Sequence, residues 1–141
     1  MAARATAEWK GDLQTGSGSF TAGDSLSGEY SFKSRFEDGP GANPEQLIAG
    51  AHAACFSMAL ALVHGEQGAT VESIKTDAKV TLRLLDEGPT ITSIELTTVG
   101  RVSGIDDSAF QEAANAAKAG CPVSKALSGV PEITLDATLE S

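Results

Sequence analysis

Two cysteines, Cys55 and Cys121, are the residues of this chain best suited to covalent chemistry. Cys121 stands directly before Pro122, which fits the first position of a helix, so unpaired N–H groups and the helix dipole would favour a thiolate there. Cys55 lies in an Ala-rich stretch that we expect to be helical, where a thiolate needs a neighbouring cation. The two thiols could form a redox pair. The alternative is that both pack as small apolar residues, as free cysteines often do.

Few charged residues are placed to assist these thiols. Arg35 stands just ahead of the Ala-rich stretch and is the best-placed cation for Cys55, while Lys125 lies close in sequence to Cys121. Arg35 would come from the end of a strand, next to a Gly-rich loop. Glu45 lies at the start of the helical stretch, where a carboxylate suits the positive end of the helix dipole. Taken alone, Glu45 therefore needs no catalytic role.

A metal site is the competing chemistry. His52 and Cys55 are one helical turn apart and could share a ligand-bearing face. A closed zinc site needs four nitrogen or sulfur ligands, and only Cys121 and His64 remain. His64 would lie about 13 Å further along the helix than Cys55. We therefore predict no metal site and expect His52 to be packed or hydrogen-bonded.

The stretch that carries Cys55 is predicted to be the central helix of the fold, from Asn43 to about His64. Asn43 can cap the helix and Pro44 fits its first position. Residues 47–63 are apolar or small almost throughout, without the polar face of a surface helix. Such a helix is normally buried on most sides.

The rest of the chain alternates strands with helices. Short β segments bounded by Gly and Ser are expected at residues 4–9, 16–21 and 29–32. Alternating apolar residues predict a long antiparallel hairpin at 71–85 and 90–102, and a last half-buried strand at 133–139. A second helix is predicted at 108–119, capped by Asp106 or Asp107 and ended by Gly120, and a short third helix at 123–127. This order predicts an α+β fold.

Composition limits the possible partners. A chain of 141 residues is long enough for one domain, predicted to span residues 1–141. The net charge of −9 without a basic block argues against nucleic acid and anionic membranes as partners. The N-terminus shows no targeting signal, and the uninterrupted apolar run at 58–63 is too short to span a bilayer. A cytoplasmic location is expected, in which a purely structural disulfide is uncommon.

Two blocks of sequence carry a family resemblance. The first block comprises residues 35–37, 43–48 and the segment AHAACFSMAL at 51–60; the second is KAGCPVS at 118–124. Together they resemble the OsmC/Ohr family of hydroperoxide reductases, and within it the OsmC branch, because His52 precedes the Ala-Ala-Cys segment. The resemblance runs nearly the whole length, from the strand that contains Trp9 to residues 133–135.

The resemblance implies roles for four residues. Cys55 matches the cysteine that attacks the peroxide, and Cys121 matches the resolving cysteine. Arg35 matches the arginine that supports the attacking thiolate, and Glu45 matches the glutamate that pairs with this arginine. The implied activity is a thiol-dependent peroxidase that acts on organic hydroperoxides and more weakly on hydrogen peroxide, in oxidative and osmotic stress defence. Its cycle would pass through a sulfenic acid and a disulfide.

The resemblance also implies the partners and the assembly. No bound cofactor is expected, but an outside dithiol, for example of the dihydrolipoyl type, must reduce the disulfide. The implied fold has antiparallel sheets packed around a long central helix, in an intertwined homodimer with its sites at the subunit boundary. Geometry agrees, because Glu45 and Cys55 would be separated by about 15 Å of rise and about 80° around one helix. Antiparallel packing of two central helices could bring Glu45 of one chain beside Cys55 of the other.

Two non-enzymatic interpretations stay open. The chain could be a non-catalytic dimer of the same fold that binds an apolar small molecule at the subunit interface. It could also be a structural dimer whose cysteines merely pack. The presence of Cys55, Cys121, Arg35 and Glu45 together favours the enzyme, because a binding module has no need of all four.

Overall fold

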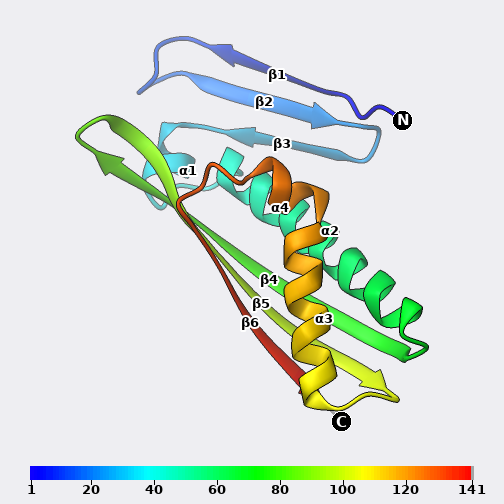
Figure 1. Cartoon of the computed structure of the whole chain (residues 1–141). Helices are drawn as coiled ribbons and strands as arrows, with labels where there is room; N and C mark the ends of the chain where they lie inside the picture. The colour runs from blue at the N-terminus through cyan, green and yellow to red at the C-terminus, as the bar shows by residue number, and fades with distance from the viewer. Residues whose placement is uncertain (141) are drawn as a thin grey trace. The chain divides into compact units, whose positions relative to one another are not determined.

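A three-stranded antiparallel sheet opens the chain in the computed structural model, which describes residues 1–140 (Figure 1). Its strands are β1 (Ala5–Lys10), β2 (Ser17–Ala22) and β3 (Leu26–Tyr30), hydrogen-bonded in that order. They belong to the first of two compact units, Met1–Leu47; the second is Ile48–Ser141. The first two predicted strands are confirmed, whereas the third, expected at 29–32, runs from Leu26 to Tyr30 and so begins three residues earlier and ends two earlier.

A short helix that the sequence did not predict, α1 (Phe32–Phe36), follows β3. Ser31 caps it: the Ser34 N–H donates to the Ser31 hydroxyl at 3.1 Å, and the Ser31 N–H donates to the Ser34 hydroxyl at 2.8 Å. This reciprocal pair satisfies two backbone donors that would otherwise lack partners. Arg35 therefore comes from a helical turn and not, as expected, from the end of a strand.

The long helix α2 (Pro44–Glu66) confirms the predicted central helix. The Asn43 side-chain oxygen accepts a hydrogen bond from the Gln46 N–H at 2.8 Å, which is the expected N-terminal cap. Within the second unit, the buried residues of α2 recur at helical spacing: His52, Phe56, Leu60 and His64. The helix thus presents one face to the core of that unit.

The predicted hairpin forms the second sheet. Strands β4 (Thr70–Leu85) and β5 (Gly88–Ser103) pair antiparallel around a tight turn at Asp86 and Glu87. Strand β6 (Glu132–Glu140), however, pairs parallel to β5, so this sheet is mixed and not wholly antiparallel. Strands β5 and β6 can be parallel because the chain between them crosses over through α3 (Asp107–Gly120) and α4 (Pro122–Ala126). This crossover allows β6 to run in the same direction as β5.

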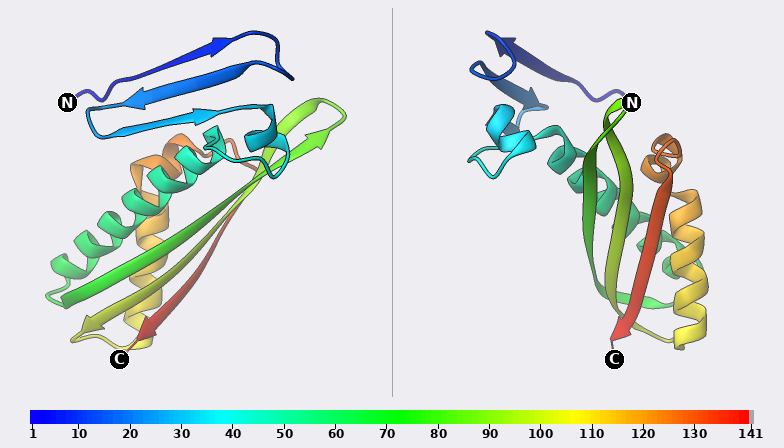
Figure 2. Two further views of the ribbon diagram at one scale, coloured as in Figure 1. Left: turned by 180° about the vertical axis from the view of Figure 1, so that it is seen from behind. Right: turned by 90° about the vertical axis from the view of Figure 1, so that its left-hand side faces the viewer.

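Helices α2 and α3 lie on the same face of this mixed sheet (Figures 1 and 2). Phe56 and Leu60 of α2 meet Phe110 of α3 and the inward residues of β5, Ile94 and Leu96, in one buried cluster. Half-buried residues of β6 complete it, at the alternate positions that the sequence predicted: Ile133, Leu135, Ala137 and Leu139. This core fixes the positions of the helices that carry the cysteines.

The junction between α3 and α4 differs from the prediction. Asp106 caps α3, as expected, by accepting a hydrogen bond from the Ala109 N–H at 2.9 Å. Gly120, however, remains helical, and the helix ends at Cys121, whose backbone is extended with φ −59° and ψ 121°. Pro122 explains this ending, because a proline disfavours helical geometry in the residue before it. Cys121 is consequently both the C-cap residue of α3 and the N-cap residue of α4.

By length and composition, α2 would suffice to cross a membrane, with a mean hydropathy of 1.7. The sequence-based argument from the short run at 58–63 therefore understated how apolar the helix is. Core helices of soluble proteins also meet this criterion. Much of the apolar surface of α2 is exposed in the single chain: Met58 is 75% and Leu62 is 62% exposed. An exposed apolar surface of this kind is typical of a site that contacts another surface.

Candidate active site

The second unit brings the two cysteines together. The sulfurs of Cys55 and Cys121 lie 3.0 Å apart and share a hydrogen bond, although the residues are 66 positions apart in the chain. Both are free thiols, Cys121 buried and Cys55 half-buried. The two cysteines that were predicted to form a pair are therefore adjacent in the structure, both as free thiols. Two thiols at this distance can form a disulfide with little movement of the backbone.

Each cysteine owes its place to a local feature of the sequence. Cys55 points from the middle of α2, one residue before the fully buried Phe56. Cys121 is held at the α3–α4 junction, where its N–H donates to the Ala117 carbonyl at 2.8 Å. Its own carbonyl accepts from the Lys125 N–H at 3.0 Å in the first turn of α4. Cys121 is thus anchored by backbone hydrogen bonds on both sides.

The two thiols differ in acidity. Burial raises the pKa of Cys55, the hydrogen bond with Cys121 raises it further, and the nearby Val123 N–H only partly opposes this. Burial also disfavours a charge on Cys121, but hydrogen bonds from Cys55, from Ser124 and from the Val123 N–H hold the pKa of Cys121 below its usual value. Within this unit the thiolate is therefore favoured on Cys121. Cys55 requires a cation to become the nucleophile.

The first unit brings together Arg35 and Glu45. The Arg35 Nη2 donates to Glu45 Oε1 at 2.8 Å, and its Nε lies 3.2 and 3.3 Å from the two carboxylate oxygens. Glu45 is only 7% exposed, and Arg35 also rests over the Phe36 ring at 5.4 Å from its centroid. The pairing of Arg35 with Glu45 is thus observed within one chain. The structure contains the four candidate residues as two pairs, one in each unit.

A second buried pair lies beside the cysteines. The His52 Nε2 is 2.7 Å from the Ser124 hydroxyl, and both residues are at least nine-tenths buried. His52 is therefore hydrogen-bonded, as predicted. Sequence reasoning did not single out Ser124, although it follows Cys121 by one helical turn just as His52 precedes Cys55. Among residues 1–140 no group of three or more His, Cys, Asp or Glu side chains is placed to hold a metal ion.

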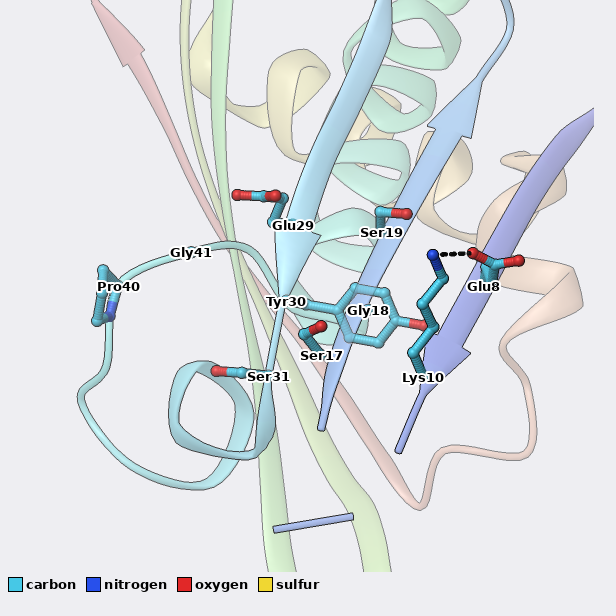
Figure 3. A pocket seen from close by; sticks show the side chains of 10 residues that line it. All are labelled: Glu8, Lys10, Ser17, Gly18, Ser19, Glu29, Tyr30, Ser31, Pro40 and Gly41. Atoms are coloured by element: carbon cyan, nitrogen blue, oxygen red, sulfur yellow. Dashed lines mark ion pairs between the residues drawn. The ribbon is translucent and has the colours of Figure 1, made fainter. Parts of the chain in front are cut away.

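The first unit also has a cavity of about 510 Å³ beside its sheet (Figure 3). Its walls carry the hydroxyls of Ser17, Ser19 and Ser31 and the Lys10–Glu8 ion pair, in which the charged groups are 3.4 Å apart. These groups are polar, and the lining includes neither cysteine nor histidine. Its lining therefore offers no group for the thiol chemistry of the second unit.

Comparison with known proteins agrees with this geometry. The model of the family described as OsmC-like protein matches residues 37–136, a segment that contains Glu45 and both cysteines. The chain belongs to the OsmC-like protein family. Its second compact unit lies almost wholly within the matched segment.

Relatives extend the match to nearly the full chain. The chain is 48% identical over 137 residues to Peroxiredoxin OsmC of Escherichia coli, covering 96% of this chain and 94% of that protein. It is 38% identical over 96 residues to the organic hydroperoxide resistance protein OhrB of Bacillus subtilis, covering 68% and 69%. The crystal structure of OhrB superimposes with a TM-score of 0.71 at 29% identity, covering 99% and 98%. The mixed α+β architecture is thus that of the OsmC/Ohr fold.

Proposed function

We propose that this protein is a thiol-dependent peroxidase that reduces organic hydroperoxides, with hydrogen peroxide as a poorer substrate, in oxidative and osmotic stress defence. The observation that carries the proposal is the 3.0 Å approach of the Cys55 and Cys121 sulfurs. The names of the relatives support it, since one is called a peroxiredoxin and another an organic hydroperoxide resistance protein. No bound cofactor is needed, because sulfur itself carries the redox change.

In the first step the Cys55 thiolate attacks the peroxide oxygen–oxygen bond. An S–O bond forms, the O–O bond breaks, and an alcohol leaves after taking up a proton, so that Cys55 becomes a sulfenic acid. In the second step the Cys121 thiolate attacks the Cys55 sulfur. The disulfide forms and the hydroxyl leaves as water. A dithiol from outside, for example of the dihydrolipoyl type, then reduces the disulfide and restores both thiols.

Arg35 and Glu45 would supply the charge that Cys55 lacks. Because burial raises the pKa of Cys55, a nucleophilic Cys55 requires a nearby cation. Glu45 holds the Arg35 guanidinium by two of its nitrogens, which leaves Nη1 available to a thiolate or a peroxide oxygen. We infer that the two pairs assemble into one active site, and that both units work as a single functional domain.

We propose further that the active molecule is a homodimer. In addition to Met58 and Leu62, α2 exposes the small residues Ala51 and Ala54 on successive turns. A second copy of α2 could approach such a surface closely and cover it. The alternative, a membrane, fits less well with a helix that contains two buried histidines and Cys55. A cytoplasmic location follows as a proposal, because reducing thiols are maintained there.

Thiol counting tests the proposed activity. The reduced protein should show two free thiols per chain, and one equivalent of an organic hydroperoxide should remove both, with release of one equivalent of alcohol. A dithiol should restore the two thiols and permit further turnover. The Cys55→Ser variant, which retains Cys121, is the matched control and should release no alcohol. Retention of both thiols in the wild-type protein after hydroperoxide treatment would contradict the proposal.

A further inference from the structure

Helix α4 lies beside α2 (Figure 1), and among residues 1–140 two side-chain hydrogen bonds join the start of α4 to α2. One joins the sulfurs of Cys55 and Cys121, which are 3.0 Å apart. The other joins His52 Nε2 to the Ser124 hydroxyl at 2.7 Å. On each side the two partners are three residues apart, which is close to one helical turn, so the two bonds run side by side. The proposed reaction uses the first bond and leaves the second without a role.

The His52–Ser124 hydrogen bond is shielded from water. His52 has no exposed surface, and Ser124 is only 8% exposed. The other ring nitrogen of His52, Nδ1, has no hydrogen-bond partner, so the bond to Ser124 is the one hydrogen bond of this ring within residues 1–140. If it broke, both groups would be left buried without a partner, which costs more free energy than an exposed hydrogen bond provides. The bond is therefore a persistent link between the two helices.

The contact between the sulfurs cannot hold the two helices together throughout the proposed cycle. In the reduced protein it is a weak hydrogen bond between thiols, and in the oxidised protein it becomes a covalent bond. Between these states Cys55 is a sulfenic acid, and Cys121 must approach its sulfur from the side opposite the S–O bond. Such an attack needs reacting atoms about 3 to 3.5 Å apart and in line. The sulfurs therefore do not fix the position of Cys121 at the stage where this position matters most.

The His52–Ser124 hydrogen bond contains neither reacting atom, so oxidation of Cys55 leaves it intact. We propose that His52 and Ser124 are positioning residues for the resolving step: their hydrogen bond keeps the start of α4 against α2 while Cys55 is a sulfenic acid. The Cys121 sulfur then stays in line with the Cys55 sulfur, the S–S bond forms as the S–O bond breaks, and the hydroxyl leaves as water. The inference rests on the proposed peroxidase function and names two residues beyond its four.

The backbone hydrogen bonds of Cys121 do not replace this link. Its N–H donates to a carbonyl of α3, and its carbonyl accepts from an N–H of α4, so neither bond reaches α2. A shift of the whole α3–α4 junction away from α2 would keep both bonds and move the Cys121 sulfur with them. Leu127 packs against the core and opposes such a shift, but apolar contacts are not directional. The hydrogen bond between His52 and Ser124 adds the missing direction.

A single turnover of the enzyme separates the two chemical steps. After one equivalent of an organic hydroperoxide, Ser124→Ala and His52→Phe should consume peroxide as fast as the wild-type protein, because the first step does not need Cys121. Formation of the disulfide should be about five- to tenfold slower, the factor that corresponds to one ordinary hydrogen bond. The sulfenic acid of Cys55 should accumulate in the interval and be trapped by dimedone.

Further variants test the hydrogen bond itself. His52→Gln retains an amide nitrogen near the place of Nε2, and Ser124→Thr retains a hydroxyl, so each should form the disulfide faster than His52→Phe and Ser124→Ala. His52→Phe leaves the Ser124 hydroxyl in place, so its effect reports on the bond and not on that hydroxyl alone. The double variant, His52→Phe with Ser124→Ala, should be no slower than the slower single variant, because both changes remove the same bond. Effects that multiply in the double variant would overturn the proposal.

Two controls separate positioning from loss of packing. His64→Phe removes the other fully buried histidine of α2, and Ser128→Ala removes an exposed serine beyond the end of α4. Neither should slow disulfide formation. Equal rates in the wild-type protein and His52→Phe, or equal slowing in His64→Phe and His52→Phe, would show that the bond does not position Cys121, and the inference would be wrong. A wild-type protein that consumes no hydroperoxide would instead refute the proposed peroxidase function.

Discussion

Arg35 binds Glu45 with two of its three guanidinium nitrogens: Nη2 lies 2.8 Å from Oε1, and Nε lies 3.2 Å from the same oxygen. The third nitrogen, Nη1, makes no hydrogen bond within residues 1–140. The carboxylate thus fixes the plane of the guanidinium and leaves one edge of it free. A lysine at this position could neutralise Glu45 but could not keep this geometry, because an ammonium is a single point of charge.

The first prediction concerns this pair. Arg35→Lys should fail to restore full peroxidase activity, and Glu45→Ala should weaken turnover while both thiols remain. In each variant the pH midpoint of Cys55 alkylation, measured with Cys121→Ser, should rise, because the thiolate loses an oriented cation. Arg101→Lys is a matched control, since Arg101 forms an exposed ion pair with Glu140. Identical titrations and equal hydroperoxide rates in all variants would mean that Arg35 is only a surface charge.

The second prediction separates the roles of the two cysteines. Cys55→Ser should abolish peroxide reduction, because a serine hydroxyl is a much weaker nucleophile at neutral pH. Cys121→Ser should preserve the first turnover but leave the sulfenic acid of Cys55 unresolved and open to over-oxidation, which mass spectrometry detects as added oxygen. Cys121 is the rival nucleophile in this test, because hydrogen bonds from Cys55, Ser124 and the Val123 N–H lower its pKa from the usual value. If Cys121 attacked the peroxide, the Cys55 variant would retain the first turnover and the assignment would be reversed.

The third prediction concerns stability against pH. Burial lowers the pKa of His52 and of His64 in the folded state, while the unfolded chain titrates near about 6.5. The unfolded state therefore binds more protons below about pH 6.5. The free energy of unfolding should fall below that pH and stay nearly constant above it, up to the alkaline range in which the cysteines titrate. The pKa of Asp12 is lowered by hydrogen bonds from Thr15, so Asp12 affects the free energy of unfolding only at more acidic pH.

Urea denaturation at a series of pH values from about 7.5 to about 5 measures this effect. Replacement of His52 and His64 by phenylalanine in one variant should flatten the dependence over this range. A wild-type stability that stays constant down to about pH 5 would show that the two histidines titrate normally in the folded state.

The central helix was predictable because its signals are local. Asn43 and Pro44 mark its start. The lack of charge along α2 predicted burial on most sides, but in the single chain only one face is buried, and Met58 and Leu62 on the other side are largely exposed. The short helix α1 was missed because two phenylalanines in five residues resemble a strand, and its one signal is the serine pair at 31 and 34. The parallel pairing of β6 depends on the chain path through α3 and α4, which strand periodicity does not specify.

The site was predictable to a similar degree. The position of Cys121 before Pro122 predicted a helix start that favours a thiolate. The Ser124 and Val123 N–H groups of α4 do help to lower the pKa of Cys121, after the hydrogen bond from Cys55, which the spacing could not show. The contact of His52 with Ser124 joins residues far apart in sequence, so no spacing could indicate it. Glu45 by itself resembled a helix-start carboxylate, and the family resemblance supplied its pairing with Arg35.

The last prediction asks which chain supplies Arg35 to Cys55. In a homodimer whose sites lie at the subunit boundary, the Arg35–Glu45 pair of one chain would serve Cys55 of the other. The Arg35→Ala and Cys55→Ser variants, each impaired alone, should then complement each other when co-refolded. One site of each mixed dimer would combine an intact Arg35 with an intact Cys55. Random pairing makes half of the dimers mixed, so activity should recover to about a quarter of the wild-type value per chain.

Two controls make this result specific. Mixing the Cys55→Ser variant with a doubly substituted chain, Arg35→Ala and Cys55→Ser, should give no recovery, because no chain contributes the nucleophile. Sedimentation of the mixture must show dimers, and Met58→Glu, which places a charge on the exposed face of α2, should shift the wild-type protein toward monomers. No complementation from a mixture that does form dimers would place Arg35 and Cys55 of one site in the same chain, and the proposed exchange between subunits would be wrong.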